Sequence, residues 1–125
     1  MKKKVRPIVV SDRRYVWWYQ IRDGLSVIVS PAGDQTAVVS IEFPCKCDSE
    51  ELPQAAAGMM PEQILLQKNN EKAAFAILSP AFVSMVIGHL TPEAFVTRKT
   101  QTCQGLDLLR EMGYQIEEIR YRMYC

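Results

Sequence analysis

The sequence predicts an α+β fold, in which an N-terminal antiparallel β-meander of three or four strands precedes two or three short helices packed on one sheet face. Three observations support this prediction. Apolar and polar residues alternate between turn-forming dipeptides, proline-initiated helical patterns occupy the second half, and a glycine precedes a final β-like segment. With 125 residues, the chain is expected to form one domain spanning 1–125 that folds without a metal or a disulfide.

The first part of the chain is predicted to be the meander. Ser11-Asp12, Asp23-Gly24 and residues 31–34 read as its turns, because Gly, Asp and Asn accept the backbone angles of tight hairpins. Pro7 lacks an N–H donor, which an edge strand tolerates. The expected strands are residues 5–10, 14–22, 25–30 and 36–43.

The middle of the chain is harder to interpret. Residues 44–61 contain three prolines and an acidic run, and they are predicted to be a long loop of the kind that is functional or mobile. Residues 62–78 fit either a hairpin turning at Asn69-Asn70 or a helix beginning at Pro61, and the hairpin is preferred.

The second half has clearer signals. Ser79-Pro80 is typical of a helix start, and Thr91-Pro92-Glu93 repeats the signal for a second helix. A helical segment is expected from Cys103 to Met112, ended by Gly113. Residues 114–124 are predicted to be a strand that returns to the N-terminal sheet. The apolar stripe of the first helix consists of Phe82, Val83, Val86, Ile87 and Leu90.

Charge is distributed unevenly, although the net charge is only +1. Residues 1–22 contain seven basic side chains against Asp12 alone, whereas residues 23–71 contain eight acids and two lysines. Such an asymmetry either steers a nucleic acid or acidic partner to the N-terminal region, or it is neutralised across the fold.

Residues 13–22 are the most distinctive segment, since they contain both tryptophans and two of the five tyrosines. In a strand, Tyr15, Trp17 and Tyr19 would line one face and Trp18 the other. A strand that is aromatic on both faces is either covered twice or exposes an aromatic surface. The candidate binding residues are Arg13, Tyr15, Trp17, Trp18, Tyr19 and Arg22.

This strand has three interpretations: core packing, a protein or self-association surface, and a platform for nucleic-acid bases. We expect a small non-catalytic interaction module that binds another protein or its own copy through this strand. The alternative is a nucleic-acid-binding module that uses the basic N-terminal region, although the glycine-aromatic motif of RNA-binding sheets is absent.

Residues with catalytic or metal-binding chemistry are few. His89 is the only histidine, and it is expected near the end of a helix. The four cysteines lack the paired C-x2-C spacing of zinc sites, and no phosphate-binding or dinucleotide-binding motif occurs. We therefore assign no cofactor, metal or catalytic residue. A small enzyme with His89 or a cysteine in a pocket is the third hypothesis.

The lysine-rich start is not followed by the roughly 7–15 apolar residues of a signal peptide. No apolar stretch approaches the roughly 20 residues that span a bilayer. A cytoplasmic location with reduced cysteines and no membrane partner is therefore expected.

Overall fold

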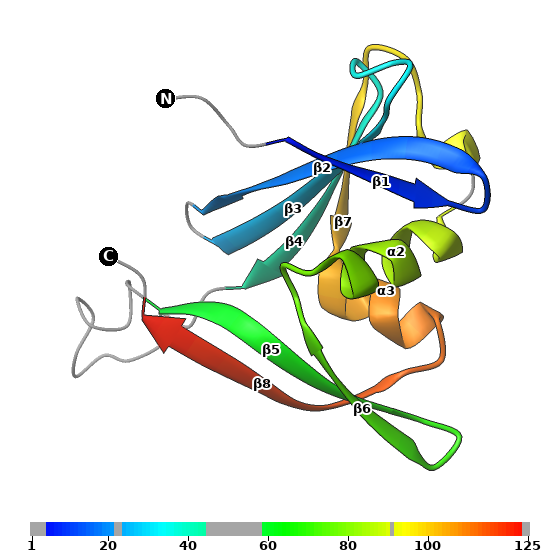
Figure 1. The fold of residues 1–125 in the computed structure, drawn as a ribbon. Coiled ribbons are helices and arrows are strands. Elements are labelled where there is room, and N and C mark those ends of the chain that lie inside the picture. The colour runs from blue at the N-terminus through cyan, green and yellow to red at the C-terminus, as the bar shows by residue number, and fades with distance from the viewer. Residues whose placement is uncertain (1–4, 22–23, 45–58, 91, 124–125) are drawn as a thin grey trace.

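The computed structural model describes residues 5–21, 24–44, 59–90 and 92–123. These residues form eight strands in two sheets, with two α-helices (Figure 1). The elements are β1 (Arg6–Val10), β2 (Arg13–Ile21), β3 (Gly24–Pro31), β4 (Val38–Pro44), β5 (Met59–Lys68), β6 (Glu71–Ala76), α2 (Pro80–His89), a 3-10 turn (Pro92–Ala94), β7 (Thr100–Gln104), α3 (Gly105–Glu111) and β8 (Gln115–Met123).

The predicted N-terminal meander is confirmed. Strands β1 to β4 pair antiparallel in chain order. Ser11 and Asp12 form the two-residue turn between β1 and β2 with φ angles of 52° and 64°, the mirror-image turn geometry that suits the twist of a hairpin. Pro7 lies in the edge strand, as expected.

This sheet has a fifth strand that the sequence analysis missed. Strand β7 pairs parallel to β4, with Val38 opposite Thr100 and Glu42 opposite Gln104. The predicted helix from Cys103 is therefore wrong at its start, because Cys103 belongs to β7 and α3 begins at the glycine after Gln104. The second helix, predicted to begin at the Thr91-Pro92-Glu93 motif, is also wrong, since Pro92–Ala94 form only a 3-10 turn.

The second sheet has the strand order β6-β5-β8. Asn69 and Asn70 form the turn of the β5–β6 hairpin with φ angles of 55° and 65°, which confirms the hairpin interpretation. Strand β5 begins at Met59, so the loop predicted for residues 44–61 is wrong for its last residues, while 45–58 lie outside the described residues.

The C-terminal strand was predicted to return to the N-terminal sheet, and this prediction is wrong. Strand β8 pairs with β5 and does not return to the N-terminal sheet. Its apolar residues Ile116 and Ile119 lie opposite Leu66 and Ile64 of β5, so the pairing places apolar side chains of both strands on one face.

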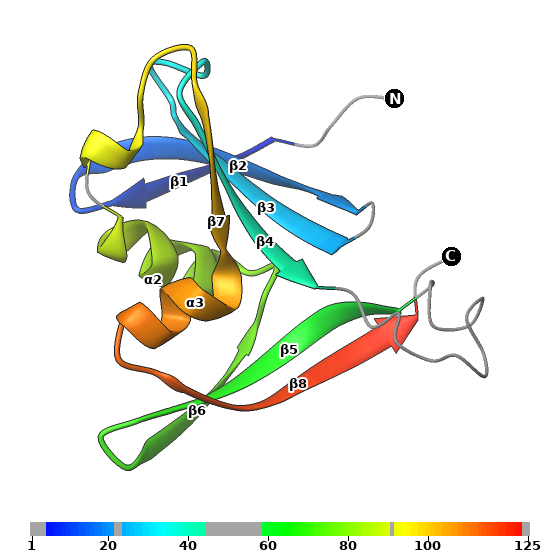
Figure 2. The same cartoon turned by 180° about the vertical axis from the view of Figure 1, so that it is seen from behind.

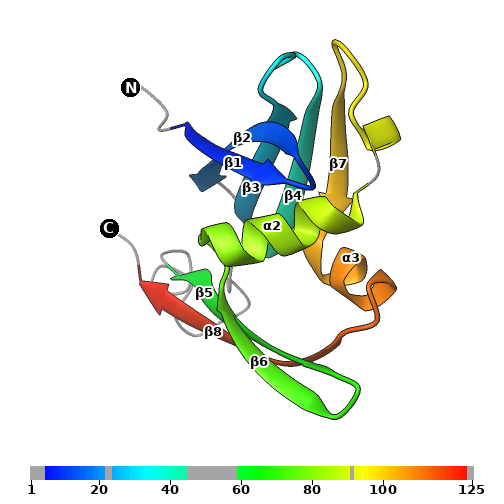
Figure 3. The same ribbon diagram turned by 45° about the vertical axis from the view of Figure 1, so that its right-hand side comes forward.

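Both helices lie between the two sheets (Figures 1 and 2), and one core fills the space that the helices and sheets enclose. The Ser79 hydroxyl accepts a hydrogen bond from Phe82 N–H at 3.2 Å and caps α2, which crosses the inner face of the five-stranded sheet (Figure 3). Gly113, with φ of 93°, ends α3 as predicted. The largest fully buried side chains include Trp17, Phe82, Leu25, Ile41, Ile64, Leu66, Ile77, Ile87 and Leu109.

Gly105 allows α3 to approach the sheet, because a Cβ atom at this position would overlap the ring of Phe43. We expect Gly105→Ala to lower the free energy of unfolding by about 1–3 kcal/mol through overpacking, measured by urea denaturation. Gly33→Ala is the matched control, since nothing lies within 4 Å of a Cβ there. Equal stability of the two variants would contradict this packing.

Candidate functional site

The outer face of the five-stranded sheet, on the side away from the helices, is the candidate site. Paired residues of neighbouring strands point to the same face, so the register defines the rows of side chains on it. Two such rows cross the sheet from β2 through β3 and β4 to β7. One row contains Gln20, Ser26, Glu42 and Gln104, and the next contains Trp18, Ile28, Ser40 and Thr102.

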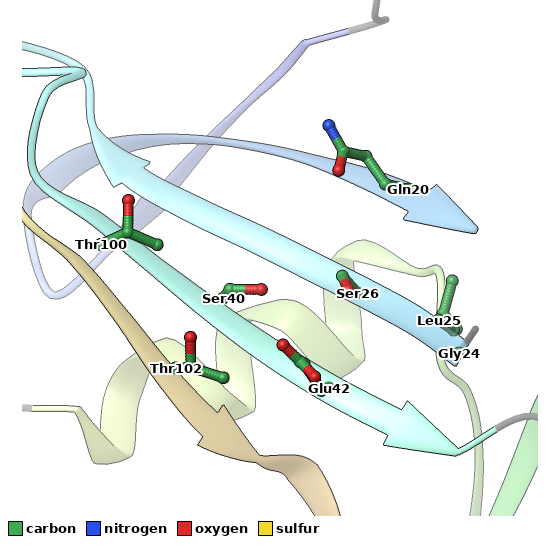
Figure 4. A pocket seen from close by; sticks show the side chains of 8 residues that line it. All are labelled: Gln20, Gly24, Leu25, Ser26, Ser40, Glu42, Thr100 and Thr102. Carbon is green, nitrogen blue, oxygen red and sulfur yellow. The ribbon is translucent and has the colours of Figure 1, made fainter. Parts of the chain in front are cut away.

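A trough with a volume of about 350 Å³ crosses these four strands (Figure 4). Serine and threonine hydroxyls both donate and accept hydrogen bonds, as does the Gln20 side-chain amide. Among the described residues of the lining, the Glu42 carboxylate is the only ionisable group. Part of this face is covered, because Trp18 and Ile28 of the second row are only 6% and 8% exposed. The described residues that line the trough are Gln20, Gly24, Leu25, Ser26, Ser40, Glu42, Thr100 and Thr102.

Asp34 connects the β3–β4 turn to the segment that leads into β7. Its Oδ1 accepts hydrogen bonds from the Thr36 hydroxyl at 2.5 Å and the Thr36 N–H at 3.1 Å, and its Oδ2 accepts one from the Thr97 hydroxyl at 2.6 Å. The Thr36 hydroxyl oxygen in turn accepts from Arg98 N–H at 3.0 Å. This network fixes where β7 enters the sheet, and so positions the threonines of the trough.

The aromatic strand divides between the two faces. Tyr15 and Trp17 point into the core and are 6% and 1% exposed, whereas Trp18 lies on the outer face and is 6% exposed. Tyr19 is 38% exposed near the end of the strand. Burial in the core thus accounts for Tyr15 and Trp17, and a binding role for this strand stays a prediction.

Of the two candidate arginines, only Arg13 belongs to the part of the chain that the structure describes. Arg13 is exposed at the start of β2, and Arg22 lies outside the described residues. Arg13 and Tyr15 line a second hollow of about 290 Å³ together with His89 at the end of α2. The structure therefore brings the only histidine next to two of the predicted binding residues.

Cys103 is partly buried on β7, and this burial, followed by the nearby charge of Glu111, raises the pKa of its thiol. A raised pKa lowers the fraction of reactive thiolate. Cys45, Cys47 and Cys125 lie outside the described residues. Within the part that the structure describes, no three His, Cys, Asp or Glu side chains group as a metal site, and no helix is long and apolar enough to cross a membrane.

No protein-family model, curated protein or solved structure matches this chain. Function is therefore inferred from the chemistry of its surfaces alone.

The sequence contained a signal for part of the trough. Ser26, Ser40 and Glu42 occupy polar positions of predicted strands that alternate apolar and polar residues, so the alternation alone puts them on a solvent-facing side. Thr100 and Thr102 had no comparable signal, because their strand was not predicted.

The Asp34 network makes stability depend on pH. Hydrogen bonds from the Thr36 and Thr97 side chains hold the pKa of the Asp34 carboxyl below its ordinary value of 3.8. The ionised group therefore stabilises the fold above pH 3.8, and this stabilisation is lost as the pH falls through the lowered pKa.

We expect Asp34→Asn to be less stable than the wild type at neutral pH, with the difference in unfolding free energy shrinking below pH 3.8. Urea denaturation of both proteins over this range measures the difference. A difference that does not change with pH would show that the ionised carboxylate contributes nothing.

Proposed function

We propose that the protein is a small, non-catalytic binding module that holds an extended segment of another protein on the outer face of its five-stranded sheet. The trough is the observation that supports this most. It crosses four adjacent strands and presents hydroxyl, amide and carboxylate groups in rows set by the strand register. Gln20, from the aromatic strand, forms one side of it.

The trough favours a polypeptide partner because of its hydrogen-bonding chemistry. Each peptide unit offers one N–H donor and one C=O acceptor, and a serine or threonine hydroxyl can pair with either. Covering these hydroxyls with apolar surface would leave them without partners, at a cost of about 1–3 kcal/mol for each group. A partner with regularly spaced main-chain donors and acceptors avoids this cost.

Glu42 adds a preference for basic segments. A carboxylate that loses contact with water without gaining a counter-charge is strongly destabilising. A Lys or Arg side chain placed beside Glu42 would supply that charge, and Arg would also match the carboxylate geometry. The expected partner is thus an extended segment that contains a basic residue.

Selection of a displayed random-peptide library on the immobilised protein tests this proposal. We expect the selected peptides to be enriched in Lys or Arg, and Thr102→Arg to abolish their binding, because the new side chain fills the trough and repels basic peptides. Glu42→Gln should lower affinity about tenfold and remove the preference for basic residues.

Gln101→Arg is the matched control. Gln101 is the neighbour of Thr102 on β7, is also exposed and belongs to the opposite face, so this variant adds the same charge without filling the trough. Failure to select any peptide, or equal loss of binding in both arginine variants, would refute binding at the trough.

Nucleic-acid binding is a second candidate, favoured by the exposed Arg13 and Arg14. Arg13 also lines the His89 hollow. Phosphate contacts release counterions, so the affinity for a nucleic acid would fall steeply with salt. Salt-insensitive or absent binding to single-stranded and duplex probes would eliminate this candidate.

A further inference from the structure

Strand β6 differs from the other sheet edges in the described part of the chain. Exposed edges pair with other chains unless proline or charge prevents it. Strand β1 contains Pro7, β8 contains Glu117, Glu118 and Arg120, and β7 is short and polar. Strand β6 forms one margin of the three-stranded sheet (Figure 3). Its last four residues, 73–76, contain neither proline nor charge and are exposed except for the partly buried Phe75.

The hydrogen bonds of the β5–β6 hairpin show which main-chain N–H and C=O groups of β6 point away from β5. Ile77 N–H donates to the Glu62 carbonyl at 3.0 Å, and hydrogen-bonded pairs alternate along an antiparallel ladder. Lys72 and Ala74 therefore direct their N–H and C=O groups away from β5. The next outward carbonyl, that of Ala76, already accepts a hydrogen bond from the Ser79 hydroxyl at 2.6 Å.

We propose that a second copy of this chain pairs antiparallel with β6, in the register that places Ala73 opposite Ala73 of the second copy. Lys72 of each copy then lies opposite Ala74 of the other, and the outward N–H and C=O groups of both residues are used in both copies. The two Ala73 side chains meet at the close, non-hydrogen-bonded pair, where small side chains fit. The three-stranded sheets join into one continuous sheet.

The side chains around β6 favour a second copy over an unrelated peptide. In this register Lys72 lies in one row with Ala74, Leu65 and Glu118 of the second copy. Its aliphatic stem extends over an apolar hollow of about 270 Å³ that Leu65, Ala74 and Glu117 of the second copy line, and its ammonium group lies on the side of the Glu117 carboxylate. The symmetry makes this contact twice. The two Lys72 side chains are diagonal neighbours on this face, and each extends toward Glu117 of the other copy and away from the other lysine.

Sedimentation velocity of the full chain tests the proposal, and we expect the wild type to be a dimer. Ala74→Pro removes an outward N–H that the monomer does not use, so its melting temperature should stay close to that of the wild type. Loss of one main-chain hydrogen bond from each copy should raise the dimer dissociation constant about a hundredfold.

Two further variants keep the test decisive. Val9→Pro is the matched control. By the same alternation along the β1–β2 hairpin, the Val9 N–H points away from β2, and this variant should leave the dimer intact. Lys72→Glu, a surface change, should weaken the dimer by placing like charges near Glu117 of the second copy. A monomeric wild type, or a dimer unaffected by Ala74→Pro and Lys72→Glu, would overturn the proposal.

Discussion

The inner face of the five-stranded sheet packs against α2, α3 and β5, and the positions of both proposed binding surfaces follow from this packing. Trp17 and Leu25 from the sheet, Phe82 from α2 and Leu66 from β5 are almost fully buried in the same core. Complete burial of a large apolar side chain contributes about 1.5–3 kcal/mol. A one-residue slip of any of these strands would move its apolar side chains to solvent, so the core also fixes the register.

A fixed register determines which polar groups gather on the other side of the sheet. Ser26, Ser40 and Glu42 point outward because their neighbours point inward, and β7 adds its threonines in parallel register with β4. The polar trough and the β6 edge are separate consequences of the same core. The first presents side-chain groups on a sheet face, and the second presents main-chain groups at a sheet margin. The two proposals can therefore fail independently.

Local patterns predicted the elements whose partners are close in the chain. The meander, the Asn69-Asn70 hairpin and the start of α2 at Pro80 each follow from turn chemistry or helix capping within a few residues. The pairings of β7 with β4 and of β8 with β5 join segments far apart in the chain, and no local pattern encodes them. For the same reason the aromatic residues could be placed on alternate faces of the sheet, but which of these faces the predicted helices cover could not be predicted.

The most direct test of peptide binding at the trough is chemical-shift mapping of the labelled protein with a basic peptide selected on it. If the outer face is the binding face, the largest shifts occur at Ser26, Ser40, Glu42 and Thr102, while the core residues of α2 and α3 change little. Shifts concentrated on the helices or on the three-stranded sheet, with none along the trough, would contradict binding on the outer face.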